Sequence, residues 1–283
     1  MIPEFYEYLT QNYEKIISKI KVPEEKAKEV KEKWIERQPR DLEGRLAGID
    51  SSWNLAKHAG FFFYLVNAVA VDQTGRYVVE PKLLADVQTA DSISQEYRSI
   101  DYYLESIGME YESELAQKAI SLGYTALVDN SALAVIYDKR NQKVTALIEY
   151  VMSLINSEDI IFIAKSSESR RDIKGSVGDV YYYTKLTYKA GISKVSYDDH
   201  GVSFFYARID DWAPVIRVEV PGKISEGEAF KIVDTLHSVS VNGYPYPLYL
   251  AHSISKITDE ELSKAESLLG LSSEPYAREV LWE

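Results

Sequence analysis

The spacing of apolar residues predicts helices at the start of the chain. Between residues 3 and 20, apolar side chains recur every three or four positions, which indicates a helix with one apolar face. A second helix is expected from Pro23 to near Pro39, because proline suits the first helical position and stops a helix that reaches it later. Residues 1–40 are therefore predicted to form a charged helical hairpin.

The pattern changes to strands after this hairpin. Apolar runs at 45–53, 61–71 and 76–87 follow one another with short connections and predict an antiparallel meander. The longest apolar stretch, residues 59–71, is too short and too interrupted to cross a membrane, so we expect it to be a buried strand.

Helices and strands then alternate. The predicted elements are a helix over 91–122, a strand over 124–137, a helix over 141–155 and a strand over 159–165. Ser92 and Gln95 have the spacing of a capping box for the first of these helices. Three strands followed by helix, strand, helix and strand is the element order of a ribonuclease-H-like core, although several other α/β folds share it. We therefore expect an α/β fold with a mixed sheet flanked by helices over residues 45–165.

Residues 166–283 predict an α+β elaboration of that core. The expected elements are helices at 178–189, 225–238, 246–256 and 259–269, and strands near 192–197, 202–209 and 214–220. Thr258 and Glu261 form a capping box for the last helix. No internal repeat or linker interrupts the chain, so we predict a single domain over residues 1–283.

Composition and charge exclude several functional classes. The chain carries 32 Lys and Arg against 44 Asp and Glu, a formal net charge of −12, so a uniformly basic nucleic-acid-binding surface is excluded. It has no cysteine, which excludes disulfides, thiolate zinc sites and cysteine nucleophiles. Acidic residues precede any apolar stretch at the N-terminus, where a signal peptide would be basic, so a cytoplasmic protein is expected.

Two aspartates in apolar strands are the first candidates for chemistry. Asp50 and Asp129 each follow an apolar run and precede small polar residues, and a carboxylate there is costly unless it is paired or binds a cation. If the first and fourth strands are neighbours, the two carboxylates lie close together and a divalent metal resolves their repulsion. The alternative for either residue alone is that it caps the turn at the end of its strand.

The helix predicted over 91–122 offers further oxygen ligands. Its glutamates are Glu105, Glu110, Glu112 and Glu114. Helical geometry places Glu110 and Glu114 together on one flank of the apolar stripe. Spacing alone does not choose between them, and solvation is the ordinary fate of such a glutamate.

Six segments together resemble the NurA nucleases of archaea and bacteria, which act with the hexameric DNA-translocating ATPase HerA. They are GIDSSW around Asp50, MEYE around Glu110, LVDNSAL around Asp129, IAKSSESRR after the fifth strand, GDVYYYTKL, and GYPYPLYLAHSISKI near the C-terminus. They occur in the family's order across residues 45–260. Ser51 and Asn130 stand where the family often has glycine, and asparagine tolerates the backbone conformations that glycine favours.

The resemblance implies a ribonuclease-H-like DNA nuclease that depends on Mn²⁺, with Mg²⁺ as the alternative cation. Such an enzyme is an exonuclease, with single-strand endonuclease activity as a further expectation, in DNA end resection and recombinational repair. It works as a homodimer, with HerA as its partner and no membrane association. Two cations would activate water and stabilise the leaving oxygen.

The resemblance also implies roles for individual residues. Asp50, Glu110, Asp129 and His252 are the expected metal ligands, and Asp50, Glu110, Asp129, Lys165 and Asp179 the expected catalytic residues. The expected DNA contacts are Lys165, Arg170, Arg171 and Lys174, for which a solvated loop is the alternative. For His252, the alternative is a structural histidine at the start of a helix.

Two other functions are alternatives to the nuclease. An actin-like ATPase would need glycine-rich phosphate turns after both aspartate-bearing strands, where this chain has SSW and NSA. A non-catalytic DNA-binding or scaffold subunit of the same fold would have no need to keep all three of Asp50, Glu110 and Asp129.

The tyrosines of residues 178–189 cannot all face one core, so we expect at least one to be exposed, for a dimer interface or for base stacking.

Overall fold

A computed structural model describes residues 2–89, 99–138, 145–157 and 159–276. Its helices are α1 (Glu4–Gln11), α2 (Tyr13–Ile17), α3 (Glu24–Lys33), α4 (Ile100–Ser121), α5 (Ala132–Tyr137), α6 (Thr145–Ile155), α7 (Asp179–Leu186), α8 (Glu226–His237), α9 (Tyr246–Ser255) and α10 (Asp259–Leu269). Its strands are β1 (Trp34–Glu36), β2 (Leu46–Lys57), β3 (Phe61–Val71), β4 (Tyr77–Thr89), β5 (Thr125–Val128), β6 (Ile160–Ala164), β7 (Gly191–Ser193), β8 (Ser196–Asp198), β9 (Val202–Arg208), β10 (Ile216–Pro221), β11 (Ser240–Val241) and β12 (Tyr244–Pro245).

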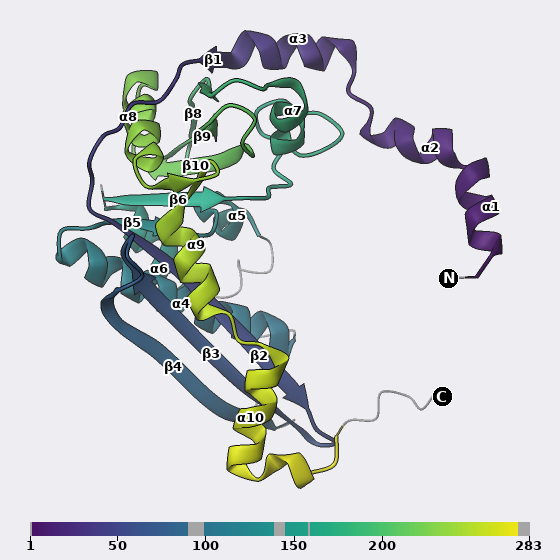
Figure 1. The fold of residues 1–283 in the computed structure, drawn as a ribbon, viewed down its shortest axis with the longest axis vertical. Helices are drawn as coiled ribbons and strands as arrows, with labels where there is room; N and C mark the ends of the chain where they lie inside the picture. The colour runs from purple at the N-terminus through teal and green to yellow at the C-terminus, as the bar shows by residue number, and fades with distance from the viewer. Residues whose placement is uncertain (1, 90–98, 139–144, 158, 277–283) are drawn as a thin grey trace.

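One large mixed sheet organises the molecule (Figure 1). Its strand order is β1-β7-β9-β10-β6-β5-β2-β3-β4, with β8 pairing to β9, while β11 and β12 form a separate pair. The pairs β2/β5 and β5/β6 are parallel, and the other pairs of the large sheet are antiparallel. This confirms the expected α/β class with a mixed sheet flanked by helices and the antiparallel meander of β2, β3 and β4.

Helices cover both faces of the sheet. On one face, Leu115 of α4 packs in the same core as Ile49 of β2 and Val128 of β5. On the other face, Leu248 of α9 packs with Leu46 of β2 and Leu127 of β5. The sheet crosses the predicted division at residue 166 without a break, since β7, β9 and β10 continue it from β6. The single-domain organisation itself stays a prediction.

The prediction of an N-terminal helical hairpin is wrong in two respects. The first predicted helix is divided into α1, α2 and a short 3₁₀ turn at Ser18–Ile20, and this segment projects from the body of the protein beyond α3 (Figure 1). The second helix ends at Lys33, because Trp34–Glu36 pairs with Gly191–Ser193 as strand β1. Only α3 packs against the body, through the buried Val30.

The strand predicted over 124–137 is also wrong in its second half. Strand β5 ends at Val128, and residues 132–137 form helix α5 instead. The Ser131 hydroxyl accepts a hydrogen bond from the backbone N–H of Ala134 and caps this helix. An apolar run as short as this one fits a strand or a buried helix equally well, so a local cap decided between them.

Other local predictions had mixed outcomes. The capping box of Thr258 and Glu261 is confirmed at the start of α10. Ser92 and Gln95 lie outside the described residues, and Ser99 caps the described start of α4 by accepting from the Tyr102 N–H. The strand predicted at 192–197 is divided between β7 and β8.

Exposed apolar side chains gather on the N-terminal segment rather than on the tyrosine-rich one. Tyr182 and Tyr183 of α7 are fully buried, whereas Tyr188 just beyond it is 51% exposed, as expected of at least one of these tyrosines. The exposed apolar residues of the segment that precedes α3 are Ile2, Phe5, Tyr6, Tyr8, Leu9, Tyr13, Ile16, Ile17 and Ile20, and we call this set the apolar arm. Within the described ranges, no helix has both the length and the apolar character needed to cross a bilayer.

Candidate metal centre

Asp50 and Asp129 lie close together because they occupy matching positions on two neighbouring parallel strands. Ile49 of β2 pairs with Val128 of β5, and Asp50 and Asp129 are the residues that directly follow this pair. The backbone N–H of Asp129 donates to the Ile49 carbonyl at 3.3 Å and continues the ladder past the end of β5. The sequence expectation that these strands are neighbours is therefore confirmed.

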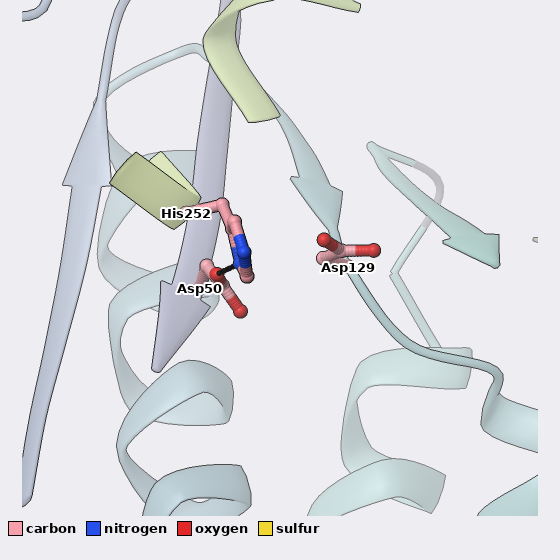
Figure 2. A group of neighbouring side chains, drawn as sticks. All are labelled: Asp50, Asp129 and His252. Atoms are coloured by element: carbon pink, nitrogen blue, oxygen red, sulfur yellow. Dashed lines mark hydrogen bonds and ion pairs between the residues drawn. The ribbon is translucent and has the colours of Figure 1, made fainter. Parts of the chain in front are cut away.

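His252 of α9 joins the two aspartates from the other end of the chain. Its Nδ1 lies 2.8 Å from Asp50 Oδ2, and one ligand atom each from Asp50, Asp129 and His252 lie within 4.8 Å of one another (Figure 2). Gly48 permits this approach, because a Cβ there would lie 2.2 Å from the Pro247 carbonyl at the start of α9. A side chain at position 48 would push α9, and with it the imidazole, away from the strand.

The electrostatics of this group favour a cation. Asp50 is buried, and burial together with the charge of Asp129 raises its pKa, while the hydrogen bond from His252 opposes that rise. The Lys165 ammonium, 2.6 Å from Asp129 Oδ2, provides one positive charge. Carboxylate oxygens together with an imidazole nitrogen form a donor set that suits divalent cations such as Mn²⁺. The residues present therefore fit the expected metal, and their role as ligands stays a prediction.

The glutamate of α4 nearest to this group is Glu112, not the expected Glu110. Glu112 Oε1 accepts hydrogen bonds from the Ser51 N–H at 3.0 Å and the Ser51 hydroxyl at 2.6 Å, directly beside Asp50. Glu110 is half-buried, and its charge helps to raise the pKa of Lys82. Glu114 forms an ion pair with the same lysine. Glu110 and Glu114 therefore lie on another flank of the helix than Glu112. Glu110 is not among the residues that the structure brings together here.

Burial of Glu112 has a large electrostatic effect. The side chain is fully enclosed, and its burial and the nearby charge of Asp50 raise the pKa of Glu112 to about 8, against the hydrogen bonds from Ser51. A protonated Glu112 keeps both bonds from Ser51, because both end on Oε1 and leave Oε2 for the proton. Without a cation, this carboxyl is therefore neutral at neutral pH.

Tyr244 is a residue of this site that sequence reasoning did not select. Its ring lies under the Lys165 ammonium at 4.8 Å, and burial and the charges of Asp129 and Asp50 raise the pKa of its hydroxyl. That hydroxyl is buried, and no hydrogen bond of good geometry reaches it within the described structure. The tyrosines of GYPYP, eight residues or fewer before His252, were the available signal.

A pocket of about 700 Å³ opens from the three metal-ligand candidates. Lys165, Arg170 and Arg171 line it, as expected of DNA contacts. Lys174 is not among the residues that line it. The pocket thus joins an acidic end to a basic rim, an arrangement that suits a polyanion bound through a cation.

Arg217, which lines the pocket, belongs to a buried ion pair. Arg217 and Glu219 of β10 are both 1% exposed and are joined by a hydrogen bond of 2.6 Å from Arg217 Nε. Glu219 also accepts from the Ser131 hydroxyl and the Leu133 N–H. The pair therefore holds the turn between Asp129 and α5 from below.

Asp179 is not brought to the metal-ligand candidates. It is fully buried at the start of α7, where its carboxylate accepts hydrogen bonds from the N–H groups of Asp172 and Ile173 and from the Tyr206 hydroxyl. Its oxygens are committed to fixing the backbone of the preceding loop. These contacts give Asp179 a structural role, and its expected role as a catalytic residue stays a prediction.

Comparison with known proteins assigns this arrangement to one family. A family model described as the NurA domain matches residues 44–257. A probable DNA double-strand break repair nuclease NurA of Methanocaldococcus jannaschii is 28% identical, with 97% of this chain and 91% of that protein aligned. The crystal structure of the NurA nuclease from Sulfolobus solfataricus has a TM-score of 0.72 at 22% identity, covering 96% of this chain and 97% of that one. A NurA structure bound to dAMP and manganese has a TM-score of 0.59 at 12% identity, covering 95% and 96%.

Proposed function

Because the chain belongs to the NurA family of DNA double-strand break repair nucleases, we propose that it hydrolyses DNA with Mn²⁺ held by Asp50, Asp129 and His252. The observation that carries the proposal is the convergence of these three ligand atoms within 4.8 Å at one end of a pocket with a basic rim. Manganese in the related structures supports the choice of cation, with Mg²⁺ as the alternative.

The residues of this chain divide the work as follows. The bound cation supplies Lewis-acid activation at a phosphodiester. Asp50 and Asp129 provide the negative charge that retains it, and the Nδ1 contact between His252 and Asp50 sets the orientation of the imidazole. Lys165 is placed to exchange its contact with Asp129 for a phosphate oxygen when a cation binds. Tyr244 presents a protonated hydroxyl beside Asp129.

The cation also explains how a chain of net charge −12 binds DNA. Neutralising the carboxylates leaves Lys165, Arg170 and Arg171 as the dominant charges around the pocket, so attraction to phosphate is local. We assign the activity to exonucleolytic and single-strand cleavage at DNA ends on a ribonuclease-H-like sheet. Asp129 and Lys165 directly follow the carboxyl ends of β5 and β6, and Asp50 lies inside the longer β2 at the level of the β5 end.

We further propose that the protein works as a homodimer and with a HerA-type hexameric ATPase. The apolar arm supports a protein partner, because its apolar side chains contact water in the single chain. A second copy of this chain is the occupant we assign to it. The surface that meets the ATPase is not assigned to particular residues.

The test is incubation of the purified protein with end-labelled DNA in the presence of Mn²⁺, Mg²⁺ or EDTA. We expect cleavage with Mn²⁺, less with Mg²⁺ and none with EDTA. Titration calorimetry with Mn²⁺ should give a binding isotherm that His252→Ala weakens. DNA binding without cleavage in any cation would instead support a scaffold subunit, and ATP hydrolysis by the chain alone would support the actin-like alternative.

A further inference from the structure

The pocket ends in a group of side chains that the metal chemistry does not use. Helix α5 begins beside Asp129 and runs along the pocket for six residues to Tyr137, roughly 9 Å at 1.5 Å per residue. At that end Tyr137 and Arg171 both line the pocket. A strand whose phosphate lies at the metal-ligand candidates therefore passes these two side chains.

Tyr137 and Arg171 form a stack that is fixed from three parts of the chain. The guanidinium carbon of Arg171 lies 3.5 Å from the centre of the Tyr137 ring. Asp198 of β8 accepts hydrogen bonds from the Tyr137 hydroxyl, at 3.1 Å to each oxygen, and from Arg171 Nη1 at 2.7 Å. The His200 ring lies perpendicular to the Tyr137 ring, at 82° with the ring centres 4.9 Å apart. These contacts define the orientation of both planes before any ligand arrives.

The stack stays accessible in spite of these contacts. Tyr137 is 40% exposed and the Arg171 side chain 33% exposed. A flat, pre-oriented and accessible surface loses little conformational entropy when another flat group stacks on it. Nucleic-acid bases are such groups, and proteins bind unpaired bases by stacking on aromatic rings and on guanidinium planes.

The hydrogen bonds favour a base over a phosphate as the ligand. A phosphate binds the N–H edge of a guanidinium, and part of that edge in Arg171 is committed to Asp198, whose charge also offsets that of the arginine. The two planes contact each other at 3.5 Å, and both side chains keep part of their surface open to the pocket. Two other basic residues of the pocket remain for the phosphates. Within the described residues Arg170 has no ion pair, and Lys165 pairs with Asp129, a carboxylate that the proposed cation would engage.

We propose that Tyr137 and Arg171 form a base-binding subsite for an unpaired nucleotide of the strand held at the metal centre. The inference rests on the proposed nuclease function and adds a substrate requirement to it. The strand must be single-stranded at this nucleotide, since a base inside a duplex is stacked between its neighbours and has no free face. Stacking reads no hydrogen-bond pattern, so the subsite accepts any of the four bases.

The test is oligonucleotide binding in Mn²⁺, measured by fluorescence anisotropy with labelled, cleavage-resistant phosphorothioate single strands that carry one abasic site at successive positions. For the wild type, we expect one position at which the abasic site weakens binding roughly 5- to 100-fold. Tyr137→Ala should weaken binding of the intact strand by a similar factor and should show no further loss with the abasic site at that position. Elsewhere along the strand, the abasic responses of the two proteins should agree.

Two variants control for structural damage. Tyr137→Phe keeps the ring and loses the hydroxyl bond to Asp198, so it should keep the abasic response. Tyr197→Ala removes a half-exposed tyrosine of β8 that does not line the pocket, and it should bind like the wild type. A wild type without any abasic-sensitive position overturns the subsite whatever the variants do, as does a folded Tyr137→Ala protein that keeps the full response.

The same experiment separates this inference from the nuclease function. A wild type that cleaves DNA with Mn²⁺ and lacks the abasic response refutes the subsite alone. A wild type that shows the abasic response and cleaves no DNA in any cation refutes the nuclease function and leaves the subsite as part of a DNA-binding protein.

Discussion

Glu219 on β10 accepts a hydrogen bond of 2.6 Å from the hydroxyl of Ser131, 88 residues earlier in the chain. Ser131 follows Asp129 by two residues and caps α5, so this bond fixes the backbone that carries a metal-ligand candidate. The charge of Glu219 in turn is balanced by Arg217, which is just as deeply buried. The position of Asp129 therefore depends on a strand that contributes no ligand.

Glu219→Gln should lower the free energy of unfolding by about 3–5 kcal/mol, because it preserves shape and leaves the buried Arg217 without its counter-charge. Urea denaturation measures this change. Glu168→Gln, at an exposed position on the rim of the same pocket, should stay within about 0.5 kcal/mol of the wild type. A loss at Glu219 no larger than that of this control would show that the pair is dispensable.

Asp50→Asn should reduce Mn²⁺-dependent DNA cleavage by about 100-fold or more without destabilising the metal-free protein. Burial and Asp129 raise the pKa of Asp50, so its charge opposes folding when no cation is present, and a neutral amide removes that cost. Cleavage of end-labelled DNA measures the activity, and thermal melting in EDTA measures the stability of the metal-free protein. Glu114→Gln, which breaks only the ion pair with Lys82, is the matched control for cleavage. Full cleavage by a folded Asp50→Asn protein would end the metal assignment.

Glu112 should matter more for the metal than Glu110 or Glu114. Its bonds to Ser51 support the residue next to Asp50, and removing an outer partner of a metal ligand commonly costs 10- to 100-fold in metal affinity. We expect Glu112→Gln to weaken Mn²⁺ binding by about tenfold in calorimetry, with much smaller effects from Glu110→Gln and Glu114→Gln. If Glu110→Gln weakened Mn²⁺ binding more than Glu112→Gln, Glu110 would be the glutamate that supports the metal, as the family motif implies.

The stability of the metal-free protein should fall as pH rises through the range in which Glu112 titrates. Its pKa is about 8 in the folded chain against an ordinary 4.5, so between these values the folded state binds a proton that the unfolded state has lost. The loss of stability is absent below the lower pKa and complete above the upper one, where it is about 5 kcal/mol. Urea denaturation in EDTA at about pH 5 and pH 9 measures it.

Glu112→Gln provides the comparison for this pH effect. The amide does not titrate, so the variant should match the wild type at the acidic end and exceed it in stability at the alkaline end. A difference between the two proteins that is the same at both pH values would mean that Glu112 is not the group responsible.

The apolar arm should hold two copies of the chain together. Light scattering should give a mass of about 64 kDa, twice the 32.2 kDa of one chain, and a variant with Leu9→Glu and Ile16→Glu should fall to the monomer mass. Leu268→Glu, at an 87% exposed position on α10, should leave the dimer intact. A wild type that is monomeric at micromolar concentration contradicts the dimer, and a dimer that the arm variant retains relocates the interface.

The sheet and its two aspartates could be predicted because short-range patterns determine them. Long apolar runs marked β2, β3 and β4, and an aspartate that ends such a run has few explanations other than a partner or a cation. Residues 132–137 could not be predicted in the same way. Their six apolar-rich positions suit a strand or a buried helix, and the choice rested on the cap that Ser131 provides once Glu219 holds it in place.

The rest of the site depends on rotations and distances that a sequence does not contain. Periodicity identified the apolar stripe of α4, but Glu110 and Glu112 differ by about 200° around the helix, and only packing against β2 decides which one faces Ser51. Asp179 was selected by a motif, and the structure assigns it to holding a loop. Tyr244 and the Tyr137–Arg171 stack are visible only when segments far apart in the chain are placed together.

The contact between Asp50 and His252 spans 202 residues, and this separation sets an order in time. Ribosomes add about 5–20 residues per second, so the first aspartate is made roughly 10–40 seconds before the imidazole that completes the group. Once Asp129 has been made as well, the nascent chain holds both carboxylates without α9. With His252 as a proposed ligand, we expect a chain truncated before α9 to bind the cation more weakly than the complete chain.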